Sequence, residues 1–329
     1  MRKEKIYYGR AVYNHKEIKA VLKVLKKNSL TLIDGKHVKK LEKTVAKIFG
    51  KKYGLMVNSG SSANLLALSS FNFKKNSEII TPNLTFSTTV APIYQLGLIP
   101  HFIGVVKNKF LADPNQIEKC INKKTVAIMI PNLLGNIADW KKINKIAKKF
   151  NLKVIEDSAD TIGYKVNNKN TGNLSDIATN SFYASHIING AGTGGMVCFN
   201  DYKLYEKAKL LRGWGRSSAT FNESEEISKR FNVKISGIDY DAKYIFSDMG
   251  YNFLPSEISA AFALEQIKKL KKNIELRNKN FKYLESFFKK FNKLFHLPEQ
   301  YSGVKTPWLA FPLVIKKNNL FNRKKLQIY

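Results

Sequence analysis

A stretch in the middle of the chain, residues 155–200, constrains the fold more than any other part of the sequence. A buried-strand pattern leads into it and delivers two acids, Glu156 and Asp157, where the strand would end. A glycine-punctuated hairpin signal follows, and then a second strand-like run over residues 177–183 leads into a glycine-rich loop. Open α/β sheets bind ligands outside the carboxyl ends of their strands. We therefore expect the acids and the loop to meet at one edge of a sheet.

The residues before this stretch alternate between helix-like and strand-like patterns. Apolar residues, among them Ile18, Leu22 and Leu25, recur at helical spacing and predict surface helices that lead into the sheet. Helices are predicted over residues 15–27, 38–49 and 139–150, and strands over residues 55–57, 78–82, 98–106 and 125–131. Such alternation is typical of βαβ units with a mostly parallel sheet and right-handed crossovers.

Small residues, including Gly60, Ser61 and Ser62, lie between the first predicted strand and an apolar helix. They would allow backbone amides to approach a phosphate, which the helix dipole also favours. The same residues suit an ordinary helix cap. The pattern by itself therefore leaves both interpretations open.

The chain is strongly basic, with 56 Lys and Arg against 25 Asp and Glu and a net charge of +31. The lysines recur along nearly every predicted helix, with no zinc-finger, helix-turn-helix or RNP signature beside them. A solvated lysine surface is therefore preferred to a nucleic-acid interface, although attraction for polyanions stays open. No stretch has the apolar length of a membrane span, and the start has no apolar signal core. We expect a cytoplasmic protein that binds neither membrane nor nucleic acid.

The two cysteines, Cys120 and Cys198, lie far apart in the sequence. Their spacing suggests no metal site, and we expect reduced thiols.

Four motifs in order resemble one enzyme family. They are the acid pair, Gly172-Asn173-Leu174-Ser175-Asp176, Ser181-Phe182-Tyr183, and Gly194-Gly195-Met196-Val197. Together they resemble the DegT/DnrJ/EryC1/StrS family of sugar aminotransferases and dehydratases, which are fold-type I pyridoxal-phosphate enzymes. The resemblance implies an α/β fold with a mostly parallel seven-stranded sheet flanked by helices, and a smaller C-terminal α/β domain.

One residue separates two reaction types within that family. Most members carry a lysine five residues after the position of Ser181, where it forms a Schiff base with the cofactor; here that position is His186. With histidine at this position, the chain resembles the branch of NDP-4-keto-6-deoxyhexose 3-dehydratases, which work with pyridoxamine phosphate. An imidazole forms no stable imine, but its ordinary pKa of about 6.5 suits proton abstraction near neutral pH. The alternative for His186 is a cap on a glycine-rich turn.

The resemblance also implies a set of cofactor contacts. Asp157 would pair with the pyridinium nitrogen, Asp160 would contact the ring hydroxyl, and Phe86 would stack on the ring. The phosphate would be bound by Ser61, Ser62 and Ser181, and by Asn252 of a neighbouring subunit, so a homodimer is expected. The alternatives are a strand-end salt bridge for the acid pair, core packing for Phe86 and a local Asx bond for Asn252.

Two departures from the family pattern affect these expectations. Iron–sulfur members of the branch carry cysteines after a Trp-Gly-Arg motif, whereas residues 214–220 contain none, so no iron–sulfur cluster and no other metal is expected. The glycine loop has Thr193 where the family usually has Glu, and it is one residue longer, which affects the placement of His186.

The C-terminal part is predicted to link and begin a second domain. We assign residues 1–270 to the large cofactor-binding domain and residues 271–329 to a linking helix and a partial small domain. Within this part we expect helix over 256–291, a strand over 308–315 and a helix from 321; residues 217–234 are expected to form a surface loop. Family members continue for further elements, so we expect a C-terminally shortened small domain.

We therefore predict a pyridoxamine-phosphate-dependent 3-dehydratase of a nucleotide-linked 4-keto-6-deoxyhexose, making deoxysugars for surface polysaccharide such as lipopolysaccharide O-antigen. The nucleotide sugar and an amino donor such as glutamate would be its small-molecule partners. One alternative is a sugar aminotransferase, which would need a lysine elsewhere. Another is a shortened chain that binds cofactor or a partner subunit without turnover. A polyanion-binding module is the least favoured.

Overall fold

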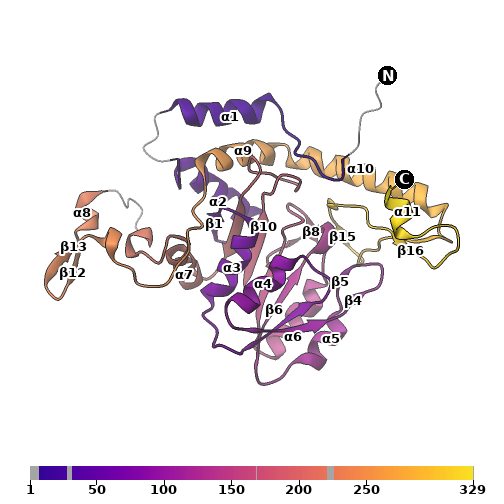
Figure 1. Cartoon of the computed structure of the whole chain (residues 1–329), viewed down its shortest axis with the longest axis horizontal. Coiled ribbons are helices and arrows are strands. Elements are labelled where there is room, and N and C mark those ends of the chain that lie inside the picture. The colour runs from indigo at the N-terminus through magenta and orange to yellow at the C-terminus, as the bar shows by residue number, and fades with distance from the viewer. Residues whose placement is uncertain (1–6, 28–31, 168, 221–225, 329) are drawn as a thin grey trace.

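The computed structural model describes residues 7–27, 32–167, 169–220 and 226–328, and a seven-stranded sheet lies at its centre (Figure 1). The strand order is β1-β11-β10-β7-β6-β2-β3, and only β11 runs antiparallel to its neighbours. The strands are β1 Tyr53–Val57, β2 Glu78–Pro82, β3 Ile99–Ile103, β6 Thr125–Pro131, β7 Lys153–Asp157, β10 Ile177–Ser181 and β11 Gly195–Phe199. The predicted mostly parallel seven-stranded sheet is confirmed.

Helices cover both faces of this sheet. The α-helices are α1 His15–Lys26, α2 Lys36–Ile48, α3 Gly60–Ser70, α4 Ser87–Gln95, α5 Pro114–Cys120, α6 Trp140–Lys149, α7 Tyr202–Arg212, α8 Ile227–Arg230, α9 Glu257–Lys268, α10 Leu270–Lys289 and α11 Arg323–Ile328. Three short 3-10 helices are η1 Leu133–Gly135, η2 Ser217–Thr220 and η3 Ala242–Tyr244.

The core is divided by the alternation of side chains along each strand. Leu55 and Ile155 face α3 and α7, in a cluster that includes Leu66 and Leu211. The next residue of each strand, Met56 or Glu156, faces the opposite side of the sheet. Met56 packs there with α2 and α9. Val154, which lies on the same face of β7 as Glu156, packs with α5 and α6. This alternation decides which strand residues can reach the α3 side of the sheet.

Helix α1 attaches to the rest of the chain through a polar anchor. The predicted surface helix is present, and its apolar residues Ile18, Leu22 and Leu25 are each about half exposed, at 49%, 47% and 50%. The buried residues are Glu17 and Val24. The carboxylate of Glu17 accepts a hydrogen bond of 2.6 Å from Nε2 of Gln266 on α9, so α1 lies along α9.

Small sheets complete the structure. They consist of β4 Val105–Val106 with β5 Leu111–Ala112, β12 Val233–Ile235 with β13 Ile238–Tyr240, β14 Phe295–His296 with β16 Val314–Ile315, and β15 Val304–Lys305 with β8 Lys165–Val166 and β9 Lys169–Asn170. The hairpin predicted after Asp157 is therefore present as β8 and β9. The predicted strand over 98–106 is divided between β3 and β4, which belong to different sheets.

Two sequence predictions in the C-terminal half were wrong. Of residues 308–315, only Val314 and Ile315 form a strand. Trp308 instead stacks on Phe281 at 4.6 Å between ring centroids, and the N–H of Leu309 donates to the carbonyl of Leu134, so this segment braces η1. Residues 217–234 were predicted to be a loop, yet their described part contains η2, α8 and the start of β12.

The domain boundary at residue 270 coincides with the start of α10 and stays a prediction. β15, which lies beyond it, pairs with β8 of the large part. In the described part of the chain, no helix combines the length and the apolar character that crossing a membrane requires.

Candidate active site

Asp157 is the centre of a hydrogen-bonded network at the carboxyl edge of the sheet. Its Oδ2 accepts hydrogen bonds of 2.8 Å from Nδ2 of Asn64 on α3 and of 2.8 Å from Oγ1 of Thr89 on α4. Its Oδ1 accepts one bond of 3.0 Å from the N–H of Ala159. Because its described hydrogen-bond donors are neutral, the carboxylate keeps its negative charge available for a cationic group of a ligand.

Glu156 does not join this site. Strand alternation turns it to the other face, where it is fully buried and accepts hydrogen bonds from Ser158 Oγ (2.8 Å) and the Gly172 N–H (2.8 Å). Burial raises the pKa of Glu156. The two acids that follow each other at the strand end therefore have separate surroundings, and neither forms the strand-end salt bridge of the alternative interpretation with any residue that the structure describes.

The N-terminus of α3 forms a cradle with the end of β10. Ser59 caps the helix, accepting a hydrogen bond of 3.0 Å from the Ser62 N–H. A Cβ at Gly60 would lie 2.6 Å from the Cβ of Ser181, so glycine is what allows the strand end to approach the first helical turn. Ser61 is exposed and Ser62 is half-buried beside this contact. Amides of the first helical turn and the Ser181 hydroxyl are the donors that an anion at a helix N-terminus requires.

His186 lies in the loop after β10 and faces Asp160. Its Nε2 is 3.9 Å from Oδ1 of Asp160, whose Oδ2 accepts a hydrogen bond of 2.7 Å from the Leu134 N–H. Burial lowers the pKa of His186, although the backbone of Ser181 and the charge of Asp157 act in the opposite direction. Burial raises the pKa of Asp160 to about 6. Nδ1 of His186 is covered by protein and has no side-chain hydrogen-bond partner among the described residues.

Phe86 and Asn252 differ in how they relate to this network. Phe86 is the N-cap residue of α4, and its carbonyl accepts from the N–H of Thr89, so it lies one turn from the Asp157 network. Its side chain is 68% exposed, so the core-packing alternative is wrong. Asn252 is exposed and forms a backbone bridge with Gly213. Within one chain, no described contact joins Asn252 to Asp157, Ser181 or His186.

Sequence reasoning missed the residues that hold the acids in place. Asn64 receives a 2.6 Å hydrogen bond from Thr179 Oγ1 and passes one to Asp157, while Thr89 is itself bonded by Thr85. The available signal was an asparagine directly before the apolar run of helix α3. The contact of Asp160 with the Leu134 backbone had no sequence signal, because any residue supplies an N–H.

The arrangement suits a ligand with a phosphate, a cationic ring nitrogen and a carbon acid. The phosphate would meet the α3 cradle, the nitrogen would meet Asp157, and the imidazole of His186 would meet the acidic C–H. No lysine takes part in the hydrogen bonds described for Asp157, Asp160 or His186. Among the residues that the structure describes, no group of three or more His, Cys, Asp and Glu side chains is placed to bind a metal.

Comparison with protein families gives one match over nearly the whole chain. Residues 12–329 match the model of the DegT/DnrJ/EryC1/StrS aminotransferase family. GDP-4-keto-6-deoxy-D-mannose 3-dehydratase of Yersinia pseudotuberculosis is 32% identical over 324 residues, covering 96% of this chain and 79% of that protein.

Solved structures show the same fold. The E. coli GDP-4-keto-6-deoxy-D-mannose-3-dehydratase with bound hydrated PLP superimposes with a TM-score of 0.84 at 31% identity, covering 98% of this chain and 82% of that one. A GDP-4-keto-6-deoxymannose-3-dehydratase with a trapped PLP–glutamate adduct also gives a TM-score of 0.84, at 30% identity, covering 98% and 83%. The predicted fold-type I architecture is confirmed.

Proposed function

Because the chain belongs to the DegT/DnrJ/EryC1/StrS aminotransferase family, we propose that it is a pyridoxamine-phosphate-dependent 3-dehydratase of a nucleotide-linked 4-keto-6-deoxyhexose. The observation that carries the proposal is a buried imidazole, His186, beside Asp160, where the family's aminotransferases carry a lysine. The similarity to GDP-4-keto-6-deoxy-D-mannose 3-dehydratases supports the same reaction and suggests a GDP-linked sugar. The product would serve the synthesis of surface polysaccharide.

The residues at the site fit the cofactor. Ser181 and the first turn of α3, at Ser61 and Ser62, would hold its phosphate, since Gly60 allows the strand end and the helix to approach each other. Oδ1 of Asp157, with its one described donor, would receive the pyridinium N–H. The exposed ring of Phe86 would cover the cofactor ring, and Asp160 Oδ1 would be available for the ring hydroxyl.

When bound, pyridoxamine phosphate supplies an amine for the substrate's keto carbon and a ring that accepts electrons. The protein's part is to place charge and to move a proton. Asp157 keeps the ring nitrogen protonated through its negative charge, which Asn64 and Thr89 orient. The imidazole of His186 would be the base that removes a proton, and the carboxylate of Asp160, 3.9 Å from Nε2, would stabilise the resulting imidazolium.

Product analysis tests this function directly. The protein would be incubated with GDP-4-keto-6-deoxy-D-mannose, pyridoxal phosphate and glutamate, and the sugar would be identified by mass and NMR. We expect a 3-deoxy sugar, with glutamate consumed to regenerate the cofactor amine. A 4-amino sugar would establish an aminotransferase instead. Absence of the cofactor's absorbance change on mixing would indicate a chain that does not bind it.

The dependence of kcat/KM on pH should report His186 and Asp160. The pKa of His186 is lowered, so its imidazole stays neutral at pH values somewhat below the ordinary pKa of histidine. Asp160 has a pKa of about 6 and becomes protonated as the pH falls through that value. Activity should therefore be constant near neutral pH and fall as the pH drops through about 6. Asp160→Asn should move this fall to lower pH, because the imidazolium loses a neighbouring negative charge. An unchanged acidic limb in Asp160→Asn would contradict the pairing.

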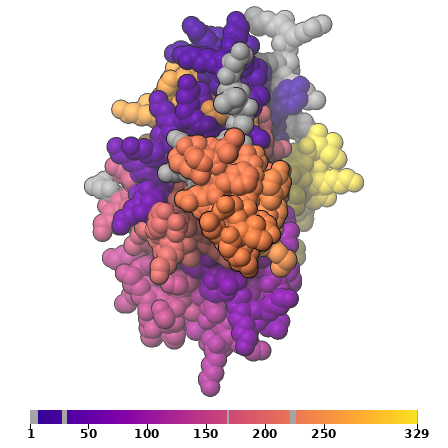
Figure 2. All heavy atoms as spheres, turned by 90° about the vertical axis from the view of Figure 1, so that its left-hand side faces the viewer, coloured from indigo at the N-terminus to yellow at the C-terminus, as the bar shows by residue number. Residues whose placement is uncertain are grey.

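A second copy of the chain is also part of the proposal. An arm made of residues 226–250 projects from the body, as Figure 1 shows at the labels α8, β12 and β13 and Figure 2 shows from its own side in orange. It exposes Ile238 (61%), Tyr244 (69%), Phe246 (56%) and Met249 (92%), apolar side chains that a partner subunit could cover. A homodimer would cover these side chains and bring Asn252 near the partner's phosphate cradle; light scattering measures its mass.

A further inference from the structure

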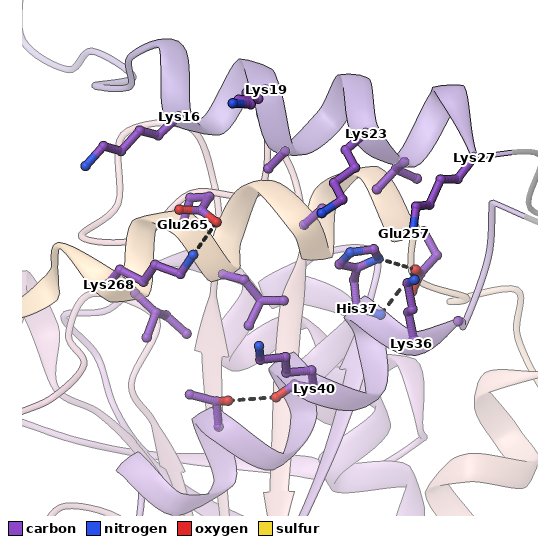
Figure 3. A pocket seen from close by; sticks show the side chains of 17 residues that line it. Lys16, Lys19, Lys23, Lys27, Lys36, His37, Lys40, Glu257, Glu265 and Lys268 are labelled. Atoms are coloured by element: carbon purple, nitrogen blue, oxygen red, sulfur yellow. Dashed lines mark hydrogen bonds and ion pairs between the residues drawn. The ribbon is translucent and has the colours of Figure 1, made fainter.

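A groove of about 1240 Å³ lies between α1, α2 and α9, apart from the candidate active site, and lysines dominate its lining (Figure 3). Its lining residues include none of the side chains assigned to the cofactor. Lysines from all three helices contribute: Lys16, Lys19, Lys23, Lys27, Lys36, Lys40 and Lys268. The sequence showed these lysines only as part of a generally basic surface, and the proposed dehydratase has no use for them.

The lysines of α1 form a continuous stripe. Lys16, Lys19, Lys23 and Lys27 are spaced three or four residues apart, which places them on one side of the helix. From Lys16 to Lys27 the stripe extends about 16 Å along the helix axis. Figure 3 shows Lys23 and Lys27 reaching down from α1 and Lys40 lying on α2 below them, so the two walls present the same charge to one space.

The acids of the groove neutralise only Lys268 among the described lining lysines. Glu257 is engaged at the start of α2, where its carboxylate accepts from the His37 and Val38 N–H groups and lies 2.7 Å from Nδ1 of His37. Glu265 pairs with Lys268 at 2.5 Å. The other lysines of the groove form no ion pair with any residue that the structure describes. Like charges that face each other within a Debye length of about 10 Å repel, and a bound anion removes that repulsion.

The other lining residues indicate what kind of anion fits. No arginine lines the groove in the described part, and the floor is made of small or aliphatic side chains such as Ala20, Val24 and Leu264. Bases of single-stranded nucleic acid stack on aromatic rings, and arginine gives the planar, bidentate recognition of particular phosphates. Among its described lining residues the groove offers neither, and the one ring there is that of His37. It offers flexible point charges along a line within a concave surface, which a flat lipid headgroup layer would not match.

We propose that this groove binds a linear inorganic polyphosphate. Such a chain carries negative charge at every unit, needs no aromatic partner, and can lie along the α1 stripe while Lys36 and Lys40 contact it from α2. The Lys268–Glu265 pair lines the end of the groove that lies away from Lys27 and Lys36 (Figure 3). Binding is expected to weaken steeply with salt, because the lysines displace counterions from the polyanion.

The test measures binding of a polyphosphate of defined length to the full chain by isothermal titration calorimetry at two salt concentrations. The groove variant carries Lys19→Gln, Lys23→Gln and Lys40→Gln. The control variant carries Lys141→Gln, Lys145→Gln and Lys148→Gln on the outer side of α6, which makes the same change in net charge on exposed lysines. Glutamine has a helix propensity close to that of lysine, so both variants should fold, as circular dichroism would check.

The groove variant should bind polyphosphate at least about tenfold more weakly than the unchanged chain, whereas the control should stay within about twofold. Equal losses in the two variants would overturn the proposal, because the attraction would then belong to the overall charge. Absence of binding at physiological salt would overturn it as well. An RNA oligonucleotide or an anionic vesicle that binds more tightly than polyphosphate, and loses that binding in the groove variant, would show that the groove serves a different occupant.

Discussion

Replacing His186 by asparagine is expected to lower kcat for dehydration by about 10²- to 10⁴-fold, which is the usual contribution of a positioned acid–base group. Asparagine keeps a polar side chain next to Asp160 but accepts no proton at neutral pH. Cofactor affinity, measured by absorbance titration, should change little, because the phosphate cradle and Asp157 lie on other elements. His15→Asn, at the exposed start of α1, is the control and should retain full activity.

The variant His186→Lys separates the two reaction types of the family. A lysine amine can bind the cofactor aldehyde covalently, which an imidazole cannot do stably. We expect dehydration to be lost and a cofactor attached to residue 186 to appear after borohydride reduction, detected by peptide mass. Dehydration at the original rate in either variant would exclude His186 as the base.

The second large effect is expected at Asp157. Asp157→Asn should lower kcat/KM by about 10²- to 10³-fold, the size of effect seen when one preorganised electrostatic contact of a reaction site is removed. Oδ2 accepts from both Asn64 and Thr89, so the asparagine carbonyl would keep that place. Its NH₂ group would then point at the Ala159 N–H and at the ring nitrogen, where an acceptor is required.

Spectroscopy distinguishes this electrostatic role from a structural one. Loss of the carboxylate should lower the pH at which the bound cofactor's ring nitrogen loses its proton, and the absorbance of the bound cofactor reports that change. Asp201→Asn is a matched control, because asparagine caps a helix as well as aspartate does and Asp201 caps α7. Unchanged activity and an unchanged cofactor spectrum in Asp157→Asn would contradict the proposed contact.

Local pattern was sufficient to predict most of the central sheet. The strand-like runs that were predicted to end at Val57, Pro131 and Asp157 are β1, β6 and β7, which end at those residues. They were recognisable because strands buried on both faces have almost continuous apolar sequences. The prediction of a strand over 308–315 was wrong because long-range contacts decide the structure of this segment. Trp308 packs on Phe281 and Leu309 bonds to η1, and such contacts leave no local periodicity in the sequence.

Amphipathic pattern predicted helix α1 but not how it is attached. Ile18, Leu22 and Leu25 have helical spacing, yet the helix is held by Glu17 through Gln266, which is 249 residues away in the chain. A buried, fully bonded carboxylate is an exception to the rule that apolar residues attach a surface helix, and only the packing partner makes it possible. The same placement of α1 turns its lysines toward α2 and creates the groove.

The sequence by itself determined the order of the elements, the family and the histidine at position 186, because these depend on local periodicity and on residue identity. The tertiary structure alone decided how the two acids are surrounded. Strand alternation separates Glu156 from Asp157, and Asp157 is oriented by Asn64 and Thr89, which lie 93 and 68 residues away in the chain. Such a network exists only when the strands and helices are packed. A hydrogen bond requires its donor and acceptor to be placed to within a few tenths of an ångström, and no linear pattern encodes that placement.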